Sequence, residues 1–484
     1  YKQGTRDVAY YYPYSSLIQE NITIGSLENQ IKNLNNTDPQ QSIEIRNYLN
    51  NLNLMISKKN RLDALLNIGK MQGYSTENST NNLFLDSINN TDISFKLSDF
   101  NKWISSDNKY TKINVTKNKA HVYFPMSKLK FEVNKENVLK QNIVIEKDTS
   151  LIENELLIDF EKNQVRGLDK KSLMILNLLE KNDWKRPIYF AITIGDPNQN
   201  PEPFLFLNDY LQLDGMVYQL VPIKNTNNES GRINSHILYD NLMNKFNWGG
   251  IDLNQHVYID ETNARMIRNF KNIFNRLTSQ LINEGELEKA DSVIQKSLST
   301  LKKELIPLEI YDLPLLENYF DLIIEKNINQ IQLGEEDSLL NDYKNLNELT
   351  NLLISRYNSE LEYYNAFKNI DIQKNWEIQN QIKLASQSLN ALFSLSKEIP
   401  NIEKNSKEQD KTVKIINKNF DKTINLIEES YNERKVNEAQ NLFSIVATYT
   451  ELANLNNDPD LNSKINELER VSILINTKKQ NDTN

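Results

Sequence analysis

Two aspartates supply the first candidate chemistry in this chain of 484 residues. Asp209 and Asp214 lie five residues apart in the run L-N-D-Y-L-Q-L-D-G-M, at the expected end of a short helix. A carboxylate pair can act as general acid and base, or can bind a sugar or a cation. Helix capping and loop formation are the structural alternatives, and the pattern favours them. The other residues selected as binding candidates are Trp184, Arg186, Tyr189, Tyr210 and Arg265.

Other kinds of site find little support. The chain has three histidines, His121, His236 and His256, which are far apart and lack a second ligand at helical spacing, and it has no cysteine. Zinc sites, disulfides and cysteine nucleophiles are therefore not expected. No phosphate-binding loop, dinucleotide fingerprint or nucleophile elbow occurs in the sequence. We expect no metal and no cofactor, and we assign no catalytic residue.

The overall charge narrows the possible partners. A net charge of -9 does not favour binding to nucleic acid or to an anionic membrane surface, because both require a basic face. No apolar run reaches the roughly 18 to 20 residues that cross a bilayer. The chain begins with Tyr1 and no signal sequence precedes it, so we expect that it is either processed or excised from a longer chain.

The candidate residues lie in one stretch, Trp184 to Ile223. It contains two strand-like runs, Ile188 to Ile194 and Met216 to Ile223, with a short amphipathic helix expected between them. A helical pattern at Lys170 to Lys181 and a strand-like run at Leu156 to Phe160 come before it. Alternating strands and helices favour parallel strands with right-handed crossovers. We therefore predict an α/β fold, with a mixed sheet that contains parallel βαβ units.

Trp184 stands where the helix must give way to a strand. Pro187 fixes its own backbone and keeps Arg186 out of the helical region, so the helix cannot continue past about Asn182. The structural interpretation is that the indole of Trp184 fills the gap between helix and sheet. The functional alternative is that Trp184 and Arg186 face a ligand at the mouth of the sheet.

The pattern changes to helix from Glu261 onwards. An apolar stripe from Met266 to Leu281, a glycine-containing turn and a second stripe around Ala290 are typical of a tetratricopeptide-like unit. One such unit cannot bury its own face, so an all-α array of helix pairs is expected. The charged stretch Lys404 to Lys414 is predicted to be a linker or exposed loop. The predicted divisions are an N-terminal helical and loop segment at 1–83, an α/β domain at 84–260, a helical repeat domain at 261–476 and a disordered tail at 477–484.

Several runs resemble a known family. These are W-K-R-P-I-Y-F-A, N-D-Y-L-Q-L-D-G-M-V-Y-Q-L-V-P-I, Y-D-N-L-M-N-K-F-N-W-G-G and V-Y-I-D-E-T-N-A-R-M-I-R-N-F. They resemble the carboxy-terminal half of a bacterial inner-membrane glycosyltransferase-like family that is related to the eukaryotic transmembrane O-mannosyltransferase. The resemblance covers roughly Phe84 to Leu301. It implies that a membrane half precedes this chain, and that the chain lies on the periplasmic face of the bacterial inner membrane. The catalytic carboxylate of that family is expected in the membrane half, and no residue here matches it.

Two functions follow as hypotheses. The first is a noncatalytic extracytoplasmic module that binds an acceptor polypeptide, a glycan or an envelope protein, and that meets the membrane only through the missing half. The second is a self-contained carbohydrate-active or hydrolytic enzyme that uses Asp209 and Asp214. A pocket that converges on both acids, with one raised pKa, would favour the enzyme. A shallow concave helical surface would favour the binding module.

Overall fold

The computed structural model describes residues 9–11, 94–105, 112–116, 119–124, 128–227, 229–253, 257–304, 306–330, 336–367, 375–398, 406–433 and 435–456. The chain forms two compact units, Tyr1–Asn234 (unit 1) and Ser235–Asn484 (unit 2). Most of the predicted N-terminal segment 1–83 and all of the tail 477–484 lie outside the described residues. Within the described residues, no helix is both long and apolar enough to cross a bilayer.

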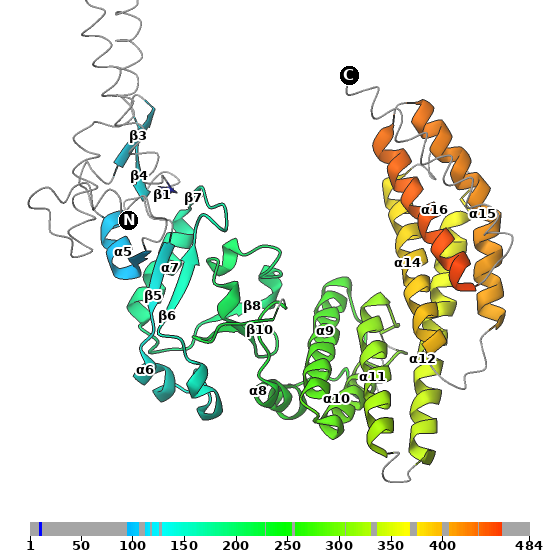
Figure 1. Ribbon diagram of the computed structural model, residues 1–484, viewed down its shortest axis with the longest axis horizontal. Coiled ribbons are helices and arrows are strands. Elements are labelled where there is room, and N and C mark those ends of the chain that lie inside the picture. Colours follow the sequence, from blue (N-terminus) through cyan, green and yellow to red (C-terminus); the bar gives the residue numbers. More distant parts are fainter. Residues whose placement is uncertain are drawn as a thin grey trace, which may run out of the picture. The chain divides into compact units, whose positions relative to one another are not determined.

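One of the three sheets described in unit 1 has three strands in the order β2-β5-β6, of which β5 and β6 are labelled in Figure 1. Its strands are β2 (Ser94–Lys96), β5 (Lys128–Glu132) and β6 (Glu155–Asp159). β5 is parallel to β2 and antiparallel to β6, with Leu129 opposite Ile158. Leu129 and Phe131 are buried while the residues between and beside them are not, which is the alternation of a strand with one buried face.

Helix α5 (Leu97–Ser105) packs against this sheet, and an aromatic cluster lies beside it. Helix α5 contacts β5, and helix α7 (Lys170–Asn182) contacts α5. The rings of Phe100 and Phe160 lie 5.4 and 5.1 Å from the ring of Phe124, and all three side chains are fully buried. A second sheet has the order β3-β4-β1-β7, made of β3 (Lys112–Thr116), β4 (Lys119–Phe124), β1 (Ala9–Tyr11) and β7 (Gly167–Leu168).

The third sheet of unit 1 is antiparallel and does not contain the predicted parallel βαβ units. It has the order β8-β10-β9, and its strands β8 (Tyr189–Ala191), β9 (Leu211–Leu213) and β10 (Val217–Leu220) are all antiparallel to their neighbours. The strand before α7, β6, pairs with β5 instead of with β8. The physical reason lies in the turn at Gly215, whose φ of 125° closes β9 and β10 into a hairpin. The expected amphipathic helix is replaced by short 3₁₀ turns at Glu202–Phe204 and Asn208–Tyr210, followed by β9.

Unit 2 is helical in its described part, and its long helices begin at the predicted residue. Helix α8 (Ser235–Asp240) comes first, and α9 (Glu261–Asn283) begins after Asp260, whose carboxylate accepts a hydrogen bond from the Asn263 N–H at 2.8 Å. Gly285, at a φ of 75°, turns the chain into α10 (Leu287–Thr300), and Ala290 is fully buried. Helices α9 and α10 both contact α11 (Leu313–Gln330).

The predicted tetratricopeptide-like repeats are not confirmed among the remaining helices, which pack against one another. These helices are α12 (Glu336–Asn365), α14 (Trp376–Glu398), α15 (Ser406–Asn432) and α16 (Val436–Asn456). Helix α12 contacts both α14 and α15, and α16 contacts the same two helices. The prediction of a linker or exposed loop at Lys404–Lys414 is wrong from Ser406 onwards, because α15 begins there.

Candidate functional site

Trp184 belongs to the scaffold of unit 1. Helix α7 ends because Asp183 and Trp184 both adopt positive φ, at 44° and 59°. The indole is 3% exposed, stacks on Phe131 of β5 at 5.2 Å with an interplanar angle of 12°, and donates a hydrogen bond to the Glu132 carbonyl at 3.2 Å. Asn137 anchors the same turn by donating to the Asp183 carbonyl at 2.8 Å. The indole therefore fills the gap between helix and sheet, as the structural interpretation expected.

The candidates that follow Trp184 are more exposed. Arg186 is exposed, and its carbonyl accepts a hydrogen bond from the Asn182 side chain at 2.7 Å. Tyr189 is 51% exposed, and its pKa is raised by burial and then by the charge of Asp214. Arg265 lies in unit 2, where its exposed side chain pairs with Glu261 at 3.0 Å. Of these residues, only Tyr189 is linked to another predicted candidate.

The structure does not bring Asp209 and Asp214 together as a pair. Asp209 stands in the 3₁₀ turn before β9 and accepts a hydrogen bond from the Asn208 side chain at 3.1 Å, whereas Asp214 directly follows β9. An extended strand advances about 3.3 Å per residue, so the two carboxylates lie at opposite ends of β9. Tyr210, between them, is buried. Asp214 has the raised pKa that the enzyme hypothesis required of one acid, but the two acids do not converge on one place.

Asp214 belongs instead to a cluster that the sequence reasoning missed, formed with Asp148, Gln212, Arg232 and Asn234. Gln212 donates to Asp214 Oδ1 at 2.9 Å, and Arg232 Nη1 donates to Gln212 Oε1 at 3.2 Å. Arg232 Nη2 donates to Asp148 Oδ2 at 2.9 Å, and Asn234 donates to the same oxygen at 3.1 Å. We call this group the Asp214 cluster.

Backbone geometry explains how the Asp214 cluster assembles. The segment around Arg232 runs beside β9: the Arg232 N–H donates to the Leu211 carbonyl at 2.8 Å, and the Leu213 N–H donates to the Arg232 carbonyl at 2.9 Å. Gly231, at a φ of 77°, permits this approach, because an added Cβ would lie 3.0 Å from the Tyr218 ring. The signal available in the sequence was this single glycine next to an arginine.

Burial makes the carboxyl group of Asp214 a weaker acid than usual. The residue is 9% exposed, and burial raises its pKa to about 6, while the hydrogen bond from Gln212 and the charge of Arg232 act in the opposite direction. A carboxyl group with this pKa can exchange a proton near neutral pH. The hydrogen bonds of the Asp214 cluster join residues around Asp148, around β9 and around Arg232, so the cluster ties together three segments of unit 1.

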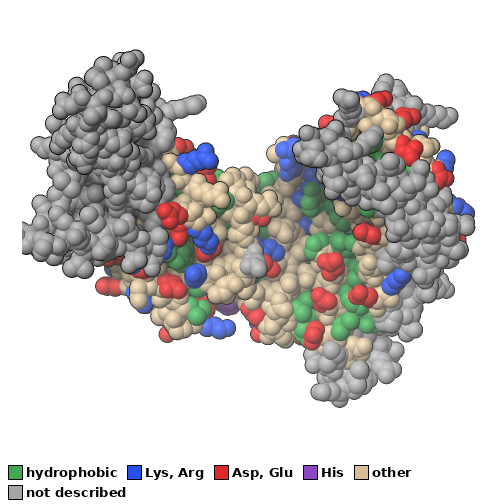
Figure 2. All heavy atoms as spheres, turned by 45° about the horizontal axis from the view of Figure 1, so that its top comes forward, with side chains coloured by type: hydrophobic (Ala, Val, Ile, Leu, Met, Phe, Trp, Pro, Cys, Tyr) green, Lys and Arg blue, Asp and Glu red, His purple; other side chains and the backbone are tan. Residues whose placement is uncertain are grey.

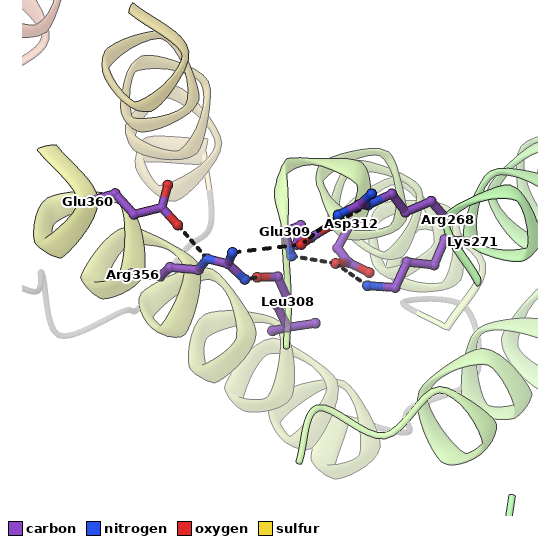
Figure 3. A network of polar contacts seen from close by, with 7 residues as sticks. All are labelled: Arg268, Lys271, Leu308, Glu309, Asp312, Arg356 and Glu360. Atoms are coloured by element: carbon purple, nitrogen blue, oxygen red, sulfur yellow. Dashed lines mark hydrogen bonds and ion pairs between the residues drawn. The ribbon is translucent and has the colours of Figure 1, made fainter. Parts of the chain in front are cut away.

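Unit 2 holds a larger polar site, shown in Figure 3. Glu309 lies between two arginines, with Arg268 of α9 on one side and Arg356 of α12 on the other. Arg268 Nε and Nη2 donate to the two carboxylate oxygens of Glu309 at 2.8 and 3.3 Å. Arg356 forms an ion pair with Glu309 at 3.7 Å, donates to Glu360 at 2.8 Å, and donates to the Leu308 carbonyl. The hydrogen bonds from Arg268 lower the pKa of Glu309, which keeps this carboxylate ionised.

A buried ion pair holds Glu309 in position. Lys271 Nζ lies 2.7 Å from Asp312 Oδ2, and both side chains are 4% exposed. The same carboxylate oxygen accepts the Glu309 N–H at 2.7 Å, within a capping box at the start of the 3₁₀ turn Ile310–Asp312. The pattern Glu-x-x-Asp after Pro307 was the sequence signal for this turn. Nothing in the sequence indicated that α9 and α12 would meet there.

The two arginines of this network line a cavity of about 730 Å³ together with Glu309 and Glu360. Aromatic and aliphatic side chains form much of its wall, and Tyr311, Tyr363 and Leu384 are 54%, 63% and 42% exposed. The Arg268 guanidinium also lies 5.5 Å from the centre of the Tyr311 ring. Figure 2 shows hydrophobic and acidic side chains side by side on the visible face of the helical region. We call this cavity the tyrosine groove. Its two arginines, Arg268 and Arg356, are paired with glutamates, so the groove combines an aromatic surface with balanced charge.

Metal binding has no support from the residues that the structure describes, since no group of three His, Cys, Asp or Glu side chains there is placed to hold an ion.

The comparisons with known proteins concern mainly unit 1. No curated protein and no solved structure gives a significant match to the chain. One family model does match, and the matched part contains β8, β9, β10 and all five residues of the Asp214 cluster. The tyrosine groove of unit 2 lies beyond it. Residues 48–237 match the model of TMEM260-associated domain 2.

Proposed function

We propose that this chain is a noncatalytic extracytoplasmic module of a glycosyltransferase-like membrane protein, and that its tyrosine groove binds an acceptor polypeptide. The groove is the observation that carries the proposal. The match of residues 48–237 to TMEM260-associated domain 2 supports a glycosyltransferase-related accessory role. The location at the periplasmic face of a bacterial inner membrane rests on the sequence resemblance alone.

The composition of the tyrosine groove fits a polypeptide. Tyrosine and arginine are the residues that most often anchor protein interfaces, because they offer large contact areas and hydrogen-bond donors. Tyr311 and Tyr363 present such areas to solvent. Since Arg268 and Arg356 are paired with Glu309 and Glu360, the groove does not require a charged ligand. A polypeptide segment that carries aromatic or aliphatic side chains and unpaired backbone groups would fit the tyrosine groove.

The enzyme alternative is favoured by one observation, the raised pKa of Asp214. General acid and base catalysis by a carboxylate pair needs both groups near the same substrate. Asp209 stands at the other end of β9, so this second group is absent from the place where the hypothesis put it. Sugar transfer or hydrolysis by the purified chain that is lost in Asp214→Asn would establish the alternative.

The test of the proposal is a peptide selection on the whole chain. A display library of random 15-residue peptides is selected on the parent protein, and the enriched peptides are then measured against the variant Tyr311→Ala/Tyr363→Ala. We expect binding to weaken at least about tenfold, because two exposed anchors are lost. Tyr258→Ala is the matched control, since this tyrosine of unit 2 is 86% exposed and does not line the groove. Failure to enrich any peptide, or equal binding by all three proteins, would contradict the proposal.

A further inference from the structure

A row of lysines follows helix α15. Lys407, Lys411, Lys414, Lys418 and Lys422 recur at intervals of four, three, four and four residues. Side chains three and four residues apart are neighbours on a helix, so the five lysines form one stripe. Like charges at this spacing repel and weaken the helix. In a chain whose net charge is -9, such a concentration of positive charge suggests that an anion binds to the stripe.

The middle of the stripe opens into a cavity of about 310 Å³. The cavity lies between α15 and the end of α12, two helices that contact each other. Its lining comprises Lys411, Lys414, Lys418, Ile415 and Asn419 of α15, and Glu362, Asn365 and Ala366 at the end of α12. We call it the lysine cavity; it is separate from the tyrosine groove, with which it shares no lining residue.

The charges of the lysine cavity are not balanced. Lys411 pairs with Glu362 at 3.2 Å. Within the described residues, Lys414 and Lys418 are exposed and have no acidic partner. Lys422, the next member of the stripe, donates to the Phe367 carbonyl at 3.4 Å, and burial and then the nearby charge of Lys418 lower its pKa. An anion between Lys414 and Lys418 would offset this repulsion.

The amide nitrogens of Asn365 and Asn419 both donate hydrogen bonds within the protein. Asn365 Nδ2 donates to the Leu361 carbonyl and to the Tyr449 hydroxyl, at 2.9 and 3.3 Å. Asn419 Nδ2 donates to the Ile415 carbonyl at 2.7 Å. We therefore expect the ammonium groups of Lys414 and Lys418 to recognise the ligand, since ammonium groups bind anions as point charges.

We propose that the lysine cavity binds a phosphate monoester. Two ammonium groups match the charge of about -1.5 to -2 that a phosphate monoester carries at pH 7, whereas a carboxylate would leave one of them without a partner. A phosphate group has few non-hydrogen atoms, so a cavity of about 310 Å³ also has room for a small organic group attached to it. The site is independent of the proposed polypeptide groove.

Isothermal titration of the full chain with glucose 1-phosphate tests the assignment. Each lysine contributes a charge-assisted contact worth about tenfold in affinity, so Lys414→Gln/Lys418→Gln should weaken binding on the order of 100-fold. The control Lys344→Gln/Lys397→Gln removes the same charge from exposed positions of α12 and α14 outside the cavity, and should bind like the parent. The parent should also bind glucose 1-phosphate more tightly than acetate.

Three results would overturn the proposal. The first is no saturable binding of glucose 1-phosphate by the parent. The second is an equal loss of affinity in both double variants, which would show a response to net charge alone. The third is binding of acetate as tight as that of glucose 1-phosphate, which would reject the phosphate monoester.

Discussion

Replacing Asp214 by asparagine should stabilise the protein at neutral pH. Burial raises the pKa of this carboxyl from 3.8 to about 6 in the folded state. Between these two values the folded protein keeps a proton that the unfolded chain has lost, so the contribution of Asp214 to stability falls as the pH rises through this window. A difference of about 2 pKa units corresponds to about 3 kcal/mol, at about 1.4 kcal/mol per unit.

The expected result therefore depends on pH. Asparagine cannot ionise, and its side-chain oxygen can still accept the hydrogen bond that Gln212 donates to Asp214 Oδ1. Asp214→Asn should raise the free energy of unfolding by up to about 3 kcal/mol at pH 8 and should change it little at about pH 4. Urea unfolding of the whole chain, followed by circular dichroism and tryptophan fluorescence at several pH values, measures this difference.

Asp209→Asn serves as the control, because Asp209 is only half-buried and Asn208 donates to an oxygen that asparagine retains. We expect little change in this variant at either pH. The reasoning about burial is refuted if Asp214→Asn lowers stability equally at pH 4 and pH 8, or if its advantage at pH 8 does not shrink as the pH falls.

The remaining predictions concern the scaffold. Trp184→Ala should cost about 3 to 5 kcal/mol of folding free energy, because it removes a buried indole and its hydrogen bond. Arg186→Ala should change the melting temperature by no more than about one or two degrees. Melting curves that coincide for Trp184→Ala and the parent would contradict the buried placement of the Trp184 side chain. Lys271→Met should cost about 3 to 5 kcal/mol in urea unfolding, because it leaves the buried Asp312 carboxylate without its ion-pair partner. Adding Asp312→Asn should recover part of that loss, and a double variant less stable than Lys271→Met would show that the charge of Asp312 is not the cause.

Local elements could be predicted from the sequence because their signals lie within a few residues. The apolar spacing from Met266 to Leu281 indicated a helix, and α9 begins at Glu261 where the pattern changes. Pro187 indicated that the preceding helix must end, and α7 ends at Asn182. The burial of Trp184 followed from the same junction.

Strand pairing could not be predicted in the same way. The runs that became β6, β8 and β10 were found, but the partner of each strand is chosen by residues distant in the chain. Asp214 and Gly215 form a hairpin turn that makes β9 and β10 antiparallel, and this turn was read as a helix end. Short apolar runs do not distinguish a parallel from an antiparallel neighbour.

The sequence by itself determined the helical character after Glu261, the absence of cysteine chemistry and the presence of an acidic residue at position 214. Only the tertiary structure decided what surrounds these residues. It separates Asp214 from Asp209 and places it near Arg232, and it brings Arg268 and Arg356, from helices far apart in the chain, to either side of Glu309. The physical reason is that periodicity reports which face of an element is buried, whereas pKa, ion pairing and groove shape depend on groups that long-range packing brings together.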